Sequence, residues 1–165
     1  MTIRENESSR RKITSTLSRI FKSKTVIVGV GNVLRGDDAF GPALVERLKG
    51  SVKDVCIDAG SAPENYLGKI AKEKPDAVII VDAAHLGQPA GGYDLLKKAD
   101  IARSGFTTHD LSPAMFIEYL EKETGADIYM LAVQPENLSF GDEMSDSVKR
   151  TLEELAALIE EAHDA

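Results

Sequence analysis

The sequence predicts an α/β fold of three layers, in which helices cover both faces of a twisted, mostly parallel sheet of five strands. The first observation is that short apolar runs alternate with helical patterns along nearly the whole chain. The second is that the central runs are apolar at successive positions, as strands buried on both faces are. The third is Gly91-Gly92, which introduces a short segment that we expect at the sheet edge, antiparallel to its neighbour.

The expected elements follow from these patterns in chain order. Strands are predicted at residues 25–30, 52–59, 76–82, 93–96 and 126–133. Helical spacing predicts helices over residues 42–49, 63–74 and 145–159, a brief turn or helix at 97–103, and a helix after Pro113. Ser61 and Glu64 fit a capping box at the start of the second helix. The predicted core-facing side chains of the helix after Pro113 are Met115, Phe116, Tyr119 and Leu120.

The first 24 residues differ from the rest of the chain. They carry a net charge of +5, whereas the remaining 141 residues carry −12, which gives −7 for the whole chain. We therefore interpret residues 1–24 as a basic extension, partly helical or disordered, and residues 25–165 as one domain. Apolar side chains at helical spacing predict a short helix that docks on the domain or forms a homo-oligomer with a neighbouring copy; they are Ile13, Leu17, Ile20 and Phe21. A helix on a membrane surface is the alternative.

Composition excludes several classes of protein. An acidic domain argues against nucleic acid as the main partner, because neutralising phosphates needs a basic face. No apolar run approaches the roughly 20 residues that a membrane span requires. Residues 9–12 contain two arginines, but no continuous apolar segment follows them, so we reject export and expect a cytoplasmic protein. The single cysteine, Cys56, is interpreted as a small core residue rather than a nucleophile.

The most informative stretch is the loop after the first strand. Gly29 and Gly31 suggest a dinucleotide-binding turn, but Leu34 stands where the third glycine of that motif belongs. Asp37 and Asp38 would also repel a phosphate placed there. Asp37 is equally well explained as a helix cap. One cap does not need two acids, so Asp38 is the better candidate for a functional site.

Two further side chains are expected at the same edge of the sheet. Asp82 ends the most apolar strand, and ligands bind beyond the carboxyl ends of parallel strands. His109 precedes a helix, where a role as a ligand and a solvent-exposed position are equally plausible. Asp82 and His85 have a chelating spacing, but His85 is expected to face solvent.

Asp38, Asp82 and His109 would together offer two carboxylates and one imidazole. This set suits a borderline divalent ion such as nickel, zinc, cobalt or iron, with positions left open for substrate or water. Without metal, two adjacent carboxylates share one proton and so provide an acid and a base. Both readings indicate hydrolysis or metal capture.

Four segments in this order resemble the nickel-iron hydrogenase maturation proteases, in the branch that processes the large subunit of hydrogenase 3. They are GVGNVLRGDDAFGP, DAGSAPEN, IIVDAAH and TTHDLSP, and the similarity extends from Thr25 to about Ile159. The resemblance implies an endopeptidase that removes a short C-terminal extension from the large-subunit precursor after nickel insertion. It also implies that Asp38, Asp82 and His109 contact the metal, and that Asp38 and Asp82 are catalytic.

The resemblance further implies that nickel arrives within the substrate as a recognition mark, so that no permanent cofactor is needed; other divalent cations would substitute in vitro. Aspartic-type and metal-assisted hydrolysis both remain open. Two rival functions also remain: a non-catalytic chaperone that binds nickel or the precursor, and a peptidase of wider specificity.

Overall fold

The structure is a computed structural model that describes residues 3–103 and 113–164. The strands are β1 (Thr25–Val30), β2 (Val55–Gly60), β3 (Ala77–Ala83), β4 (Tyr93–Lys97) and β5 (Asp127–Val133). The helices are α1 (Ile3–Ile20), α2 (Phe40–Leu48), α3 (Leu67–Lys72), α4 (Lys98–Arg103), α5 (Pro113–Thr124) and α6 (Asp146–Asp164), and the 3-10 turns η1 (Gly36–Ala39) and η2 (Pro63–Tyr66) precede α2 and α3.

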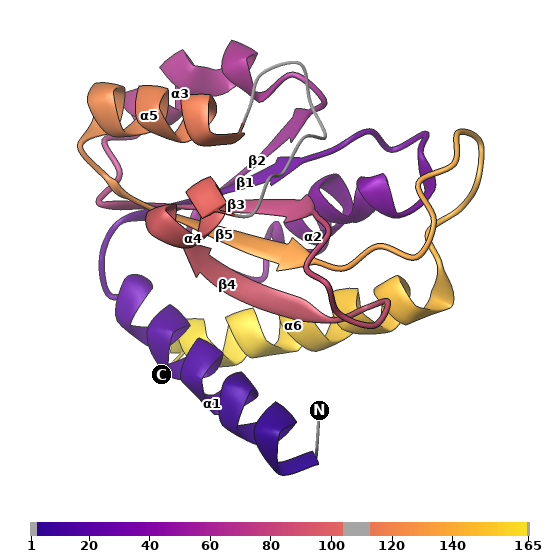
Figure 1. The fold of residues 1–165 in the computed structure, drawn as a ribbon. Coiled ribbons are helices and arrows are strands. Elements are labelled where there is room, and N and C mark those ends of the chain that lie inside the picture. The colour runs from indigo at the N-terminus through magenta and orange to yellow at the C-terminus, as the bar shows by residue number, and fades with distance from the viewer. Residues whose placement is uncertain (1–2, 104–112, 165) are drawn as a thin grey trace.

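The five strands form one sheet in the order β2-β1-β3-β5-β4 (Figure 1). All neighbours pair in parallel except β4, which runs antiparallel to β5 at the edge. The predicted fold class is therefore confirmed, including the antiparallel edge strand. Because β1, β2, β3 and β5 point the same way, the loops that follow them meet at one edge of the sheet, which we call the carboxyl rim.

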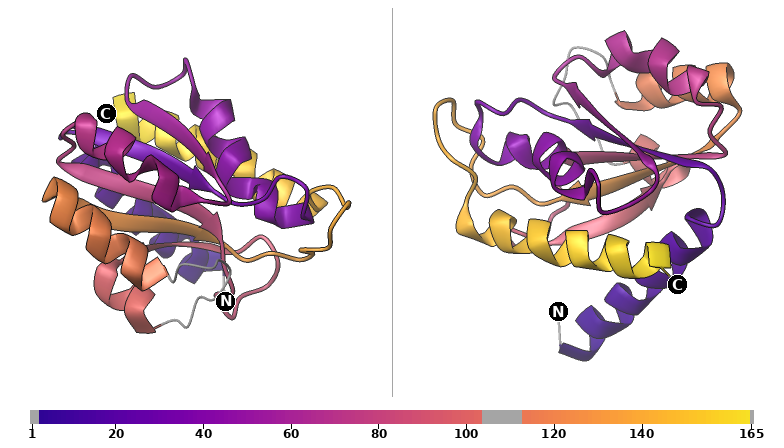
Figure 2. Two further views of the ribbon diagram at one scale, coloured as in Figure 1. Left: turned by 90° about the horizontal axis from the view of Figure 1, so that it is seen from above. Right: turned by 180° about the vertical axis from the view of Figure 1, so that it is seen from behind.

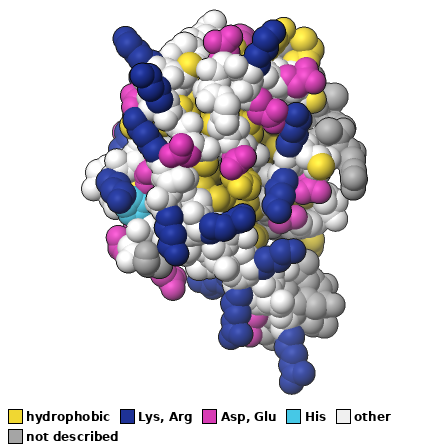
Figure 3. Space-filling view, turned by 90° about the vertical axis from the view of Figure 1, so that its left-hand side faces the viewer, with side chains coloured by type: hydrophobic (Ala, Val, Ile, Leu, Met, Phe, Trp, Pro, Cys, Tyr) yellow, Lys and Arg dark blue, Asp and Glu magenta, His cyan; other side chains and the backbone are white. Residues whose placement is uncertain are grey.

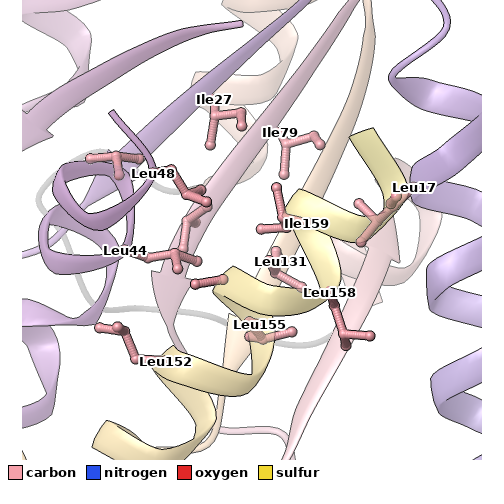
Figure 4. Close-up of a cluster of buried hydrophobic side chains, with 14 of the residues drawn as sticks. Leu17, Ile27, Leu44, Leu48, Ile79, Leu131, Leu152, Leu155, Leu158 and Ile159 are labelled. Atoms are coloured by element: carbon pink, nitrogen blue, oxygen red, sulfur yellow. The ribbon is translucent and has the colours of Figure 1, made fainter. Parts of the chain in front are cut away.

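Helices cover both faces of the sheet, as the two views from above and behind also show (Figure 2). Alternate side chains of β1 and β3 enter different cores. Ile27 and Ile79 pack with α1, α2 and α6 on one face (Figure 4), whereas Val28 and Ile80 pack with α3, α4 and α5 on the other. Both faces of the central strands are thus buried, which explains their continuous apolar sequence.

The amino-terminal helix packs on the domain of its own chain. Ile13, Leu17 and Ile20 are buried, and α1 contacts α6. An apolar stripe of three or four side chains is enough to hold such a helix on a core. Association of two copies through this helix stays a prediction. No helix in the described ranges has the length and hydropathy needed to cross a bilayer.

Charges of both signs mix on the side where the parallel strands begin. In this view Lys and Arg side chains alternate with Asp and Glu over the domain, while α1 at the bottom shows mainly Lys and Arg (Figure 3). A nucleic-acid site would need a continuous basic face. The part of this face that the structure describes offers none on the domain itself.

Two local predictions were wrong. The residue that precedes η2 is Ala62, with no side-chain cap, so the capping box at Ser61 does not form. In α5 the buried residues are Phe116, Ile117 and Leu120, whereas Met115 and Tyr119 are exposed. His163 lies in the last turn of α6.

The imidazole of His163 lies between two segments distant in sequence. Its Nε2 is 2.8 Å from Oδ2 of Asp54, and its ring packs edge-on against Phe21, with the ring centroids 5.7 Å apart. The end of α6 is therefore fastened to the start of β2 and to the segment after α1.

Candidate functional site at the carboxyl rim

Asp38 lies at the rim, in η1, directly after β1. Its Oδ2 accepts a hydrogen bond of 2.8 Å from the backbone N–H of Asn32, and its own N–H donates to the carbonyl of Arg35 at 3.0 Å. The loop after β1 therefore folds back on itself and holds the Asp38 carboxylate against the end of the strand. The side chain is only partly buried, so it remains accessible from the rim.

Glycine at position 31 allows this close approach. Gly31 has φ +147°, and a Cβ built there would lie 1.9 Å from the backbone oxygen of Asp38. No side chain fits in that space, and few residues other than glycine adopt this backbone conformation. Gly31 therefore lets the backbone of η1 pack against the end of β1 beside the Asp38 carboxylate.

Asp82 lies on the neighbouring strand at the same rim. The register pairs Gly29 of β1 with Val81 of β3, so Asp82 stands beside the last residue of β1. It follows Val78 and Ile80 on the face of the sheet covered by α3 and α5, and it is 3% exposed.

The start of α2 brings η1 close to β3. A Cβ on Gly41 would lie 2.3 Å from the carbonyl oxygen of Val30 and 2.4 Å from that of Val81. The helix therefore begins directly over the ends of both strands, and η1 contacts β3. Asp38, in η1, and Asp82, near the end of β3, thus lie at one rim of the sheet.

His109 lies outside the described residues, so its predicted position at the rim stays a prediction. The helix that follows it, α5, ends at Thr124, close to the start of β5 at Asp127. Since α5 leads into a strand that runs toward the rim, the helix itself runs away from the rim and begins nearer to it. Within residues 3–103 and 113–164 no three His, Cys, Asp or Glu side chains lie close enough to hold a metal ion.

His85, four residues after Val81, is exposed as expected. Its Nδ1 lies 3.4 Å from the side-chain nitrogen of Gln134, and the side-chain oxygen of Gln134 accepts a 2.6 Å hydrogen bond from the N–H of Leu86. Gln134 therefore connects the loop after β3 with the loop after β5.

The reading of Asp37 as a helix cap was wrong. Asp37 is fully buried, and its carboxylate accepts hydrogen bonds from the loop after β5. The donors are the backbone N–H groups of Glu136 at 2.8 Å, Asn137 at 2.9 Å and Ser145 at 2.7 Å, and the Ser145 hydroxyl at 2.8 and 2.9 Å. No local sequence signal links residues about 100 positions apart, so this role could not be predicted.

The arrangement has a clear chemical capacity. Carboxylates such as these are the side chains that hold a divalent cation in some proteins, and that share a proton and act as an acid and a base in others. Both capacities agree with hydrolysis. Neither requires a nucleotide, whose phosphates the two acids would repel.

Comparison with known proteins identifies a family of proteases. The sequence profile of the family described as HycI, hydrogenase maturation protease, matches residues 42–162. The hydrogenase 3 maturation protease of Escherichia coli K12 is 34% identical over 131 residues, which cover 78% of this chain and 83% of that protein.

Solved structures agree with these sequence matches. The crystal structure of a [NiFe] hydrogenase maturation protease HycI from Thermococcus kodakarensis KOD1 superposes with a TM-score of 0.82 at 37% identity, covering 91% of this chain and 99% of that one. The solution structure of an endopeptidase HycI from Escherichia coli has a TM-score of 0.76 at 32% identity and covers 84% and 90%.

Proposed function

Since this chain belongs to the hydrogenase maturation protease family, in its hydrogenase 3 branch, we propose that it removes a short C-terminal extension from the nickel-loaded precursor of a hydrogenase large subunit. The observation that supports this proposal is that Asp38, in η1, and Asp82, in β3, both belong to the carboxyl rim of the sheet. A peptide bound along the rim would present its scissile bond to both carboxylates.

Nickel enters this proposal as part of the substrate. Asp38, Asp82 and His109 bind the nickel centre of the precursor, because carboxylate oxygens and an imidazole nitrogen suit this borderline ion. Binding aligns the peptide and makes cleavage conditional on metal insertion. The protein then needs no resident cofactor, and other divalent cations substitute for nickel in vitro.

The carboxylates also act on the peptide bond. One of them accepts a proton from the attacking water and returns it to the leaving amine, which is general acid–base catalysis. The substrate's metal polarises the carbonyl in the metal-assisted version of this step. In the aspartic version the two carboxylates share the proton between them.

Mass spectrometry of a purified precursor, with and without nickel, tests the proposal. The wild-type protein should shorten only the nickel-loaded precursor, and Asp38→Asn and Asp82→Asn should each reduce the rate by about 10²-fold or more. Glu46→Gln, an exposed substitution on α2, is the control and should leave the rate unchanged.

The rival functions give different products. A chaperone would bind the precursor and leave it at full length, and a peptidase of wider specificity would cleave the apo precursor as well. If both aspartate variants process the precursor at the wild-type rate, the site assignment is wrong.

A further inference from the structure

Exposed apolar side chains gather at one place on the carboxyl rim. Among the large hydrophobic side chains of the described residues, Phe140, Val33 and Leu34 are the most exposed, at 73%, 60% and 57%. Val33 and Leu34 lie in the loop after β1, and Phe140 lies in the loop after β5. Single exposed apolar residues are ordinary on a protein surface, but a cluster beside a candidate active site marks an interaction surface.

Backbone contacts hold the two loops side by side. The N–H of Gly141 donates to the carbonyl of Leu34 at 2.7 Å, which places Phe140 next to Leu34. The N–H of Gly36 donates to the carbonyl of Asp142 at 3.1 Å. The adjacent loops therefore carry all three exposed apolar side chains, and we call Val33, Leu34 and Phe140 the apolar rim patch.

The buried Asp37 carboxylate holds both ends of the loop that carries Phe140. It gathers N–H donors from both ends of the loop after β5, Glu136 at one end and Ser145 at the other. Charge-assisted hydrogen bonds of this kind are stronger than neutral ones. A surface already fixed in place loses little conformational entropy when a partner binds, so its affinity per contact is higher.

The patch is continuous with the candidate active site. The side chain of Asn32 accepts a 2.9 Å hydrogen bond from the N–H of Leu34, and its backbone N–H donates to the Asp38 carboxylate at 2.8 Å. Leu34 and Asp38 thus belong to one hydrogen-bonded loop. Whatever binds the patch lies beside Asp38.

The charges around the apolar rim patch favour one kind of binding partner over another. Glu136, Asp142 and Glu143 are exposed on the same loop as Phe140, and the exposed Arg35 beside Leu34 offsets one of these three charges. A second copy would bring a domain of net charge −12 against these acids and would cover Asp38, so it is disfavoured. An apolar segment flanked by Lys or Arg has complementary charge.

We propose that Val33, Leu34 and Phe140 bind an apolar segment of the substrate precursor that is flanked by Lys or Arg. Binding of this segment holds the scissile peptide against Asp38. This inference rests on the proposed function, because it takes the precursor as the occupant. The patch residues determine affinity for the substrate and take no part in the chemistry.

Steady-state cleavage of the nickel-loaded precursor, measured together with its direct binding, tests the proposal. The variant Leu34→Ser/Phe140→Ser should raise KM about tenfold or more and leave kcat near the wild-type value, because burial of one large apolar side chain is worth about a factor of ten in affinity. Asp38→Asn, in contrast, should lower kcat. Tyr119→Ser, an exposed substitution on α5, should change neither constant.

Binding of fluorescently labelled precursor separates this inference from the proposed function. Wild-type KM and affinity in the double variant, with cleavage intact, would overturn the patch and leave the protease assignment standing. A wild-type protein that binds without cleaving, and loses binding in the double variant, would support the patch and reject cleavage. A wild-type protein that neither binds nor cleaves the precursor would overturn both.

Discussion

At the scale of single residues, two adjacent acids in this protein do different work. Asp37 is fully buried and holds the loop after β5, whereas Asp38 is partly buried and faces the rim. The sequence shows only a pair of aspartates before a helix. Residue type and position alone indicate Asp38 as a candidate ligand, but the role of Asp37 depends on Ser145 and Asn137, which reach it only through the fold.

Replacement of Asp37 by Asn should destabilise the protein. The amide keeps one acceptor oxygen but turns an NH2 group toward the N–H groups of the loop after β5, so at least one buried donor loses its partner. We expect a loss of about 3 kcal/mol in the free energy of unfolding, measured by urea denaturation.

The exposed acid Glu143 supplies the control for this measurement. Its Oε2 is 3.9 Å from the Nζ of Lys149, and Glu143→Gln should cost less than about 0.5 kcal/mol. Equal stability of Asp37→Asn and the wild-type protein would show that the hydrogen bonds of Asp37 contribute nothing to the loop.

Cys56 should be unreactive in the native protein. Burial, with a smaller contribution from Asp54, raises the pKa of its thiol from 9.0 to about 11. Since the thiolate is the reactive form, labelling by a thiol reagent at pH 8 should be about 100-fold slower in the folded than in the urea-unfolded protein. Equal rates in the two states would show that the thiol is neither buried nor protonated as described.

At the scale of elements, the periodicity of apolar residues predicts where the helices and strands lie. Individual contacts between residues determine how these elements pack. The apolar runs gave the five strands to within about three residues. The orientation of α5 was predicted wrongly, because Met115 and Tyr119 are apolar enough to suit a buried face, and only packing against α3 and α4 selects Ile117 instead. The contact of α2 with the ends of β1 and β3 requires glycines, because a larger residue would not fit there. No sequence pattern shows which glycines have this role.

Gly41→Ala should test that contact. The added methyl group would meet the carbonyl oxygens of Val30 and Val81, so α2 must move away from the sheet, at a cost on the order of 3 kcal/mol. The shift would also displace Asp38, and the rate of precursor cleavage should fall in the protein that remains folded.

Gly68→Ala on α3 is the matched control. A Cβ at Gly68 meets no atom within 4 Å, and alanine favours a helix over glycine by about 1 kcal/mol. This variant should therefore be slightly more stable than the wild-type protein. A Gly41→Ala variant with the same stability and rate as Gly68→Ala would contradict the close packing of α2 on the strand ends.

At the scale of the whole molecule, the topology makes the site. Parallel pairing of β1 with β3 brings the ends of both strands to one rim, and this follows from the alternation of strands and helices that the sequence displays. The rim itself was thus predictable, as were Asp38 and Asp82 upon it. The joining of the loops after β1 and β5 was not, since it arises from hydrogen bonds between segments that meet only in the folded chain.

The central claim is that Asp38 and Asp82 jointly hold the metal that the precursor presents. Anomalous diffraction from crystals soaked in a nickel salt tests it most directly. We predict a nickel peak with oxygen ligands from both side chains, and loss of that peak in crystals of Asp82→Asn grown and soaked in the same way. A nickel peak that touches neither carboxylate, or one of unchanged height in Asp82→Asn, would contradict the account.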